Sequence, residues 1–451
     1  MSLVFDSTTY EIKTLVHEGV TVTYRAFTHI PYVEKPVLPD WQCLSIYVPE
    51  AYYKDEASIN GYNLATAPIF FPNAVGGYKP GKECEPEIWT DDNTGATHAN
   101  SLFHALAHGY VVVSAGLRGR GMKDENDKFI GCAPAVICDL KAVIRYLRFN
   151  KGRVPGNVER IISNGTSAGG AISSLLGSTG NHPDYEPYLK AMGAANATDN
   201  IFAASCYCPI TNLDHADMAY EWEFGRCGTK TPERETISKE LQAMFPTYVN
   251  GLKLKDELGN ALTLNANGTG AFADYVKEQV IMTCEKELTK GTDLSSYDWI
   301  VVKDGKVVDI DLTKYIFYRT RMKEAPAFDN IAMGTPENEL FGNENTFYRH
   351  FTKFACEHSE VNGELAEEMQ IKMMNPMNYI DDASATKAQY FRIRHGAIDR
   401  DTSLAIPVIL ATKLKNQGID ADFALPWGVP HAGDYDLDEL FEWVDKVCAE
   451  P

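Results

Sequence analysis

One stretch of ten residues constrains the fold of this chain more than any other. Residues 161–170 read IISNGTSAGG, in which a short apolar strand runs into GxSxG around Ser167, and small apolar residues follow. A serine at so sharp a strand-to-helix turn has a strained backbone, and the residues two before and two after it, Gly165 and Gly169, have no room for side chains. The first amides of the following helix favour negative charge at the serine. The stretch predicts Ser167 as a nucleophile; the alternative is a chance GxSxG in a loop.

Strand and helix patterns alternate on both sides of this turn. Short apolar or alternating runs predict strands at Cys43–Tyr53, Ala67–Phe71, Tyr110–Ser114, Glu159–Ser163, Ala203–Ile210, Gln389–Arg394 and Ala421–Leu425. Apolar residues three and four apart predict helices at Val136–Arg148, Leu404–Gln417 and Leu437–Cys448. This order favours a mostly parallel, doubly wound sheet with helices on both faces. With GxSxG after a strand, it indicates the α/β-hydrolase fold.

The pattern changes between about residues 211 and 387. Thr231 before Pro232 is typical of a helix start, and residues 271–287 read as a helix. Asp304-Gly305 between two short apolar runs is a strong hairpin signal. We therefore expect residues 1–210 and 388–451 to form the α/β-hydrolase core, and residues 211–387 to form a large inserted lid or substrate-binding domain.

A general base and an acid are expected after the last two strands, because this fold orders its triad as serine, acid and histidine. His431, in PHAGD, lies after the final predicted strand and is the expected base. His395 ends the preceding strand, so we expect it to line the site or pack beside it. Asp399 follows that strand and is the expected acid. Asp401 is the competing acid, or a cap for the helix that begins near Ser403.

Two backbone amides are needed to bind an oxyanion at this nucleophile. Ala168 supplies one by its position after Ser167. The small residues of NAVGGY, at 73–78, allow close approach after an early strand, and Gly77 is the expected second donor. Each such donor contributes about 3–4 kcal/mol of transition-state stabilisation. The alternative for this stretch is an ordinary β-turn.

Composition excludes several classes of partner. The formal net charge is −20, and so acidic a chain repels phosphate backbones, which argues against nucleic acid. No apolar run approaches the roughly 18 residues of a membrane helix. The 10 cysteines are scattered without paired CxxC motifs, so we expect neither a metal nor another cofactor. The first residues lack a secretory pattern, which predicts a cytoplasmic protein, unless a leader has been removed.

These motifs together resemble one known family, the bacterial tannases (tannin acyl hydrolases). The resemblance covers most of the chain and rests on GTSAGG, the long insertion, NPMNYI at 375–380, the Asp399-Arg400-Asp401 element and PHAGD. In fungal members, cysteines directly precede the catalytic serine and histidine and bond to each other. Thr166 and Pro430 stand at those places here, which agrees with the bacterial subtype.

The resemblance also implies a substrate grip. In that family a lysine and a glutamate from the insertion, with a second aspartate beside the triad aspartate, hold the hydroxyls of a galloyl ring. Lys323, Glu337 and Asp401 match these positions, and Glu339 is a neighbouring competitor for Glu337. Carboxylates suit this task because they accept hydrogen bonds from phenolic hydroxyls.

The expected function is a serine esterase that cleaves galloyl esters through an acyl-enzyme and releases gallic acid. The expected partner is a small phenolic ester. A feruloyl-type or general carboxylesterase is the alternative within the same fold, and a peptidase is a more distant one. A non-catalytic binding module is the alternative from another class. The sequence leaves the alcohol half of the ester and the oligomeric state open.

Overall fold

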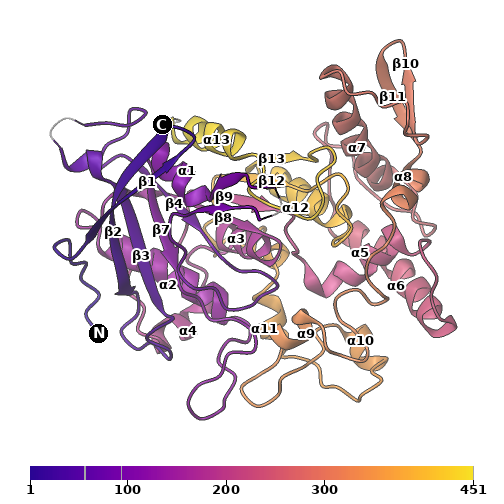
Figure 1. The fold of residues 1–451 in the computed structure, drawn as a ribbon. Coiled ribbons are helices and arrows are strands. Elements are labelled where there is room, and N and C mark those ends of the chain that lie inside the picture. The colour runs from indigo at the N-terminus through magenta and orange to yellow at the C-terminus, as the bar shows by residue number, and fades with distance from the viewer. Residues whose placement is uncertain (55–56, 93, 450–451) are drawn as a thin grey trace.

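A mixed sheet forms the centre of the computed structural model, which describes residues 1–54, 57–92 and 94–449 (Figure 1). Its strands lie in the order β1-β2-β3-β7-β4-β8-β9-β12-β13. Their bounds are β1 (Glu11–His17), β2 (Val20–Pro31), β3 (Cys43–Pro49), β4 (Pro68–Pro72), β7 (Val111–Ala115), β8 (Asn157–Thr166), β9 (Ala203–Tyr207), β12 (Tyr390–Arg394) and β13 (Asp420–Ala424). The strands from β7 to β13 in this order are all parallel, which confirms the predicted fold class.

The N-terminal side of the sheet differs from the prediction. Strand β1 pairs antiparallel with β2, and β2 pairs antiparallel with β3. Neither β1 nor β2 was predicted. Strand β3 ends at Pro49, and Glu50–Tyr53 forms a 3₁₀ turn where the strand was expected to continue. A further small pair, β5 (Ile88–Thr90) and β6 (Thr97–Ala99), lies outside the main sheet.

Helices cover both faces of the sheet, because successive side chains of each buried strand point to opposite sides. Phe70, Val112 and Ile162 pack beneath α1 (Ser101–Ala107) and α13 (Leu437–Ala449). Ile69, Val113 and Ile161 face the opposite layer. That layer contains α2 (Ala135–Phe149), α3 (Ala168–Ser178), α4 (Glu186–Ala191) and α12 (Ala405–Asn416) (Figure 1).

The segment between β9 and β12 adds no strand to the main sheet in the described part of the chain. It contains α5 (Leu213–Phe224), α6 (Pro232–Gly251), α7 (Ala271–Thr289), β10 (Ile300–Lys303), β11 (Lys306–Ile310), α8 (Leu312–Arg319), α9 (Pro336–Leu340), α10 (Lys353–Glu357) and α11 (Glu368–Lys372). Helices α5–α8 and the β10–β11 hairpin lie together at one side of the sheet, with α9–α11 below them in the view (Figure 1).

Two signals within this segment predicted its local structure correctly. Thr231 caps α6 through a hydrogen bond from the amide of Arg234. Asp304 and Gly305 both have positive φ, 51° and 72°, as a tight hairpin turn between β10 and β11 requires. The buried side chains of the segment join the same hydrophobic core as α2, α3 and α12. No helix in the described part of the chain is long and apolar enough to span a membrane.

The entry into this segment is shorter than the predicted strand Ala203–Ile210. Strand β9 ends at Tyr207, because Cys208 adopts a positive φ of 35° and Pro209 has no amide for a ladder hydrogen bond. The chain then runs past the C-terminal end of β8, where the amide of Ile210 lies 3.4 Å from the carbonyl oxygen of Ser167.

Candidate active site

Ser167 stands between the end of β8 and the start of α3, with φ 61° and ψ −122°. A Cβ atom at Gly165 would lie 2.3 Å from the carbonyl oxygen of Gly169. A Cβ atom at Gly169 would lie 2.6 Å from Oδ1 of Asn73. The backbone therefore has the strained turn that GxSxG predicts, and both glycines are required by direct contact with neighbouring chain.

The loop after β4 is fastened to this turn by one side chain. The Asn73 amide nitrogen donates to the carbonyl oxygens of Asn164 and Gly169, both at 3.1 Å, and to the Ser173 hydroxyl at 3.0 Å. Asn73 thus fixes the start of the 73–78 loop relative to Ser167. Sequence reasoning did not identify it, because nothing in a single asparagine marks such a contact.

Gly77 lies further along this loop, in the left-handed region at φ 52°. Its carbonyl oxygen accepts a hydrogen bond of 2.5 Å from Nε of Arg120, whose guanidinium also pairs with Glu339. The Gly77 amide donates to no acceptor within the described residues. The Ala168 amide is at the first position of α3, where helix amides have no intrahelical partner. Both amides are therefore free to receive an oxyanion.

The partly exposed His431 pairs with the fully buried Asp399. Nδ1 of His431 lies 2.8 Å from Oδ2 of Asp399, and the other carboxylate oxygen accepts the amide of Asp401 at 2.8 Å. Burial disfavours the imidazolium, but the hydrogen bonds with Asp399 and Cys208 outweigh it and raise the pKa of His431 above its ordinary value of 6.5. Burial also opposes charge on Asp399, yet the nearby His395 ring and the hydrogen bonds with His431 and the Asp401 amide keep the pKa of that carboxyl below its usual range.

The loop that carries His431 packs directly on the nucleophile turn. A Cβ atom at Gly433 would lie 1.8 Å from the Thr166 hydroxyl, so only glycine allows this approach. Nε2 of His431 lies 3.9 Å from the buried Cys208 thiol. This cysteine was not expected at the site, since it reads as part of an apolar strand.

The buried ion pair of Arg319 and Glu223 contacts the backbone of Asp399. Arg319 donates to the Asp399 carbonyl oxygen at 3.1 Å and forms an ion pair with Glu223. Glu223 in turn accepts the amide of Leu404 at 2.7 Å. His395 is fully buried, with Nδ1 3.7 Å from Asp399, and burial lowers the pKa of His395. His395 therefore packs beside the site, one of its two expected places.

The two aspartates of the Asp399-Arg400-Asp401 element have different partners. Asp399 contacts His431, whereas Oδ1 of Asp401 lies 2.9 Å from Nζ of Lys323. The hydroxyl of the fully buried Tyr220 bonds to both of these segments. It accepts the Lys323 amide at 3.1 Å and donates to the Arg400 carbonyl oxygen at 3.0 Å. Tyr220 gave no signal in the sequence, because its partners are far away along the chain.

Glu337 lies in α9, which Thr335 caps. The residue is only 6% exposed, and its carboxylate is approached by its own backbone amide but forms no ion pair or hydrogen bond with another residue in the described part of the chain. Burial raises the pKa of Glu337, and Lys323 is close enough to oppose that rise. Glu339, the competing residue, is instead occupied by Arg120. A buried carboxylate without a partner is costly unless a ligand supplies hydrogen-bond donors.

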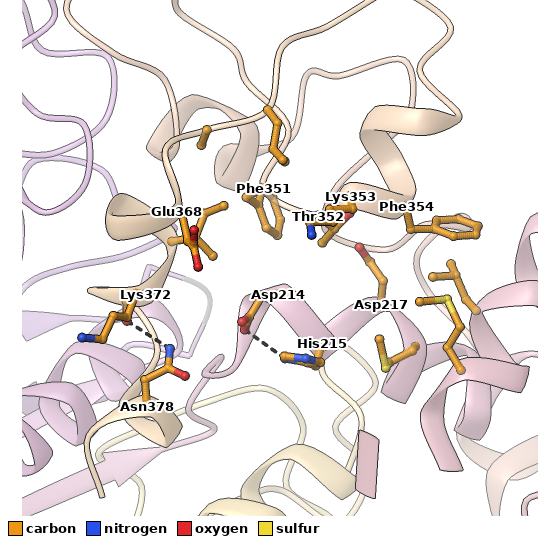
Figure 2. Close-up of a pocket in the computed structure, with 16 residues that line it drawn as sticks. Asp214, His215, Asp217, Phe351, Thr352, Lys353, Phe354, Glu368, Lys372 and Asn378 are labelled. Atoms are coloured by element: carbon orange, nitrogen blue, oxygen red, sulfur yellow. Dashed lines mark hydrogen bonds and ion pairs between the residues drawn. The ribbon is translucent and has the colours of Figure 1, made fainter. Parts of the chain in front are cut away.

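Two cavities are relevant to the location of the site. One of about 390 Å³ includes Ser167 and Asp434 in its wall. Another of about 700 Å³ lies among α5, α6, α10 and α11, with Phe351 and Glu368 across from Asp214 and His215 (Figure 2). The described residues that line the larger cavity include none of the predicted site residues. Of the two cavities, only the smaller has a predicted site residue, Ser167, in its described wall.

Comparisons with known proteins agree with this geometry. An α/β-hydrolase family model described as BD-FAE matches residues 89–245. The native tannin acyl hydrolase of Lactobacillus plantarum is similar over 99% of both chains, at 46% identity and TM-score 0.94. The Fusobacterium nucleatum tannase is similar at 44% identity, with the same coverage and TM-score. A tannin acyl hydrolase in complex with ethyl gallate is 46% identical, at TM-score 0.94 over 99% of both chains. No curated protein sequence matches the chain.

Proposed function

The chain belongs to the bacterial tannase family of α/β-hydrolases, and we propose that it hydrolyses galloyl esters at Ser167. One observation carries the assignment. Asp399 and Asp401 are two residues apart, and they hold His431 at 2.8 Å and Lys323 at 2.9 Å. A single short element thus connects the base to the lysine expected to grip the ring. That link explains why ring recognition and catalysis occur at one place.

The reaction proceeds in two acyl-transfer steps. The Ser167 hydroxyl attacks the ester carbonyl carbon while Nε2 of His431 takes its proton, and Asp399 holds the imidazole in the required tautomer. The amides of Ala168 and Gly77 stabilise the oxyanion. His431 then returns the proton to the departing alcohol oxygen. Water, deprotonated by His431, attacks the acyl-enzyme and releases gallate, and Ser167 regains its proton.

Recognition of the galloyl ring follows from the polar groups of the insertion. A galloyl ring carries three adjacent hydroxyls, and Glu337 and Asp401 accept hydrogen bonds from such donors. The Lys323 ammonium, 3.9 Å from the Phe328 ring centre, donates to phenolic oxygens. Rings without hydroxyls leave these groups unpaired, so the site rejects them. Residues 211–387 thereby act as a substrate-binding lid on the catalytic core of residues 1–210 and 388–451.

A panel of three esters tests this function. Methyl gallate, methyl ferulate and 4-nitrophenyl acetate are compared at equal enzyme concentration, with gallate measured directly. The proposal expects kcat/KM for methyl gallate to exceed that for methyl ferulate by at least a hundredfold. Comparable turnover of both methyl esters would favour the feruloyl-type or general carboxylesterase. No turnover of any ester would overturn the enzymatic assignment.

A further inference from the structure

The cavity beside Ser167 has walls from three parts of the chain. The loop 72–76 forms one wall, and the nucleophile turn, Gly165–Ser167, forms the second. The third contains Asn100–Leu102, at the start of α1, together with Asp434 from the histidine loop. Its volume of about 390 Å³ is within the range of small-molecule sites. The reaction as described above leaves this space without a role.

The 73–78 loop borders this cavity at one end and approaches Glu337 of the predicted galloyl grip at the other. At one end of the loop, Asn73 to Gly76 border the cavity. At the other end, Gly77 is held by Arg120, and both Arg120 and the neighbouring Tyr78 lie close enough to Glu337 to interact with its charge. Lys323, Glu337 and Asp401 are not among the described residues that line the cavity. The cavity that adjoins Ser167 is therefore distinct from the residues of the predicted galloyl grip.

The cavity wall is mainly apolar, with one carboxylate. Pro72, Val75 and Leu102 supply apolar surface, and no lysine or arginine lines it within the described residues. Asp434 accepts the side-chain amide of Asn164 at 2.9 Å, which fixes the orientation of its carboxyl group. Burial raises the pKa of Asp434, with hydrogen bonds from Asn164 and Ser101 opposing that rise. Such a wall suits a ring that carries few hydroxyls.

We propose that this cavity binds the alcohol half of the ester, and that it prefers an aromatic alcohol whose ring hydroxyl donates to Asp434. The proposal rests on the proposed galloyl ester hydrolysis. A sugar would have to remove many hydroxyls from water, and the side-chain amides of the asparagines in the wall already donate to acceptors within the protein. A flat ring buries apolar surface against Val75 and Leu102 and needs only the one acceptor.

Four galloyl esters of primary alcohols test this preference without a large change in leaving-group chemistry. They are methyl gallate, benzyl gallate, 3-hydroxybenzyl gallate and the 6-O-galloyl ester of glucose. The expected kcat/KM for benzyl gallate is at least tenfold above that for methyl gallate. The expected value for 3-hydroxybenzyl gallate is a further three- to tenfold higher, and that for the glucose ester stays below benzyl gallate.

Variants then locate the effect. Cys84 lines the cavity and is a partly buried free thiol. Cys84→Phe fills the space, so it should lower kcat/KM for benzyl gallate at least tenfold more than for methyl gallate. Ala74→Phe, at the exposed rim, should do the same if Cys84→Phe folds poorly. Cys356→Phe replaces another partly buried free thiol, on α10 outside the cavity, and should leave the benzyl-to-methyl ratio unchanged. Asp434→Asn should remove the advantage of the 3-hydroxyl.

The two levels of the proposal fail separately. Absence of methyl gallate hydrolysis in the unaltered protein would overturn the proposed function and the subsite with it. Hydrolysis of methyl gallate with no preference for benzyl gallate would overturn the subsite alone. A benzyl preference that survives both Cys84→Phe and Ala74→Phe would place the alcohol elsewhere and also overturn it. A glucose ester preferred over benzyl gallate would contradict the aromatic assignment.

Discussion

The ammonium group of Lys323 lies 2.9 Å from a carboxylate oxygen of Asp401, and each side chain is about one-fifth exposed. The pair is therefore partly shielded from water yet open to a ligand. Asp401 is positioned by the same short element that presents Asp399 to His431, and its own amide donates to Asp399. Displacing the lysine should consequently affect recognition of the ring more than the chemistry at Ser167.

Replacement of Lys323 by methionine tests this separation. The change keeps most of the side-chain length and removes the charged donor. A hydrogen bond to a charged group is worth about 1.5–3 kcal/mol, so kcat/KM for methyl gallate should fall roughly ten- to hundredfold. Turnover of 4-nitrophenyl acetate, which has no hydroxylated ring, should change by less than about threefold. Equal losses on both esters would show that Lys323 supports the fold and not the ring.

Tyr220→Phe addresses how Lys323 is positioned. The buried tyrosine hydroxyl accepts the amides of Met322 and Lys323 and donates to the carbonyl oxygen of Arg400, so its loss leaves three partly buried backbone groups without this partner. Stability should fall by about 1–3 kcal/mol, measured by chemical denaturation. In the folded variant, KM for methyl gallate should rise while kcat for 4-nitrophenyl acetate stays close to that of the unaltered protein. An unchanged KM would refute the positioning role.

The pH dependence follows from the raised pKa of His431. The base acts in its neutral form, so kcat/KM falls about tenfold per unit of pH below that pKa. Because the pKa of His431 lies above 6.5, a plot of log kcat/KM against pH should begin its fall on the acidic side at a pH above 6.5. Asp399→Asn removes the carboxylate that stabilises the imidazolium, so the pKa of His431 should drop. NMR titration of the histidine rings in both proteins measures this directly, and an identical pKa in the two would contradict the predicted pairing.

The buried Arg319–Glu223 pair is expected to matter for stability. Arg319→Met leaves the Glu223 carboxylate buried without its partner, which should lower the free energy of unfolding by about 3–5 kcal/mol. The double change Arg319→Met with Glu223→Gln removes both charges and should cost less than the single change. A double variant less stable than Arg319→Met would mean that the pair is not the main contribution at this position.

Local patterns in the sequence predicted the features that depend on neighbouring residues. The GxSxG motif predicted the turn at Ser167. The strands expected before Asp399 and His431 predicted that these two residues lie on adjacent loops, where they contact each other. The family resemblance named Lys323 and Asp401 as ring-binding residues, and in the structure they form an ion pair, while their contact with a ring stays a prediction. Each of these predictions rested on a motif or on the order of the strands, and both can be recognised in a sequence.

Contacts between distant segments could not be read in this way. Tyr220, Asn73 and Arg120 each connect parts of the chain that are far apart, and no pattern in the sequence marks these contacts. Strands β1 and β2 were missed for a local reason: their hairpin turns at Glu18-Gly19, and Glu-Gly is not one of the residue pairs that mark such a turn in a sequence. Strand β9 ends early because Cys208 turns the backbone. The choice between Glu337 and Glu339 also required the structure, since only the position of Arg120 separates them.

Gallate release from methyl gallate by the unaltered protein and by Ser167→Ala tests the central claim most directly. The account predicts steady gallate release that falls by at least about a thousandfold in the variant, with circular dichroism unchanged. A folded Ser167→Ala protein that still releases gallate at a comparable rate would contradict it, because the acyl-enzyme would then form at another residue or not at all.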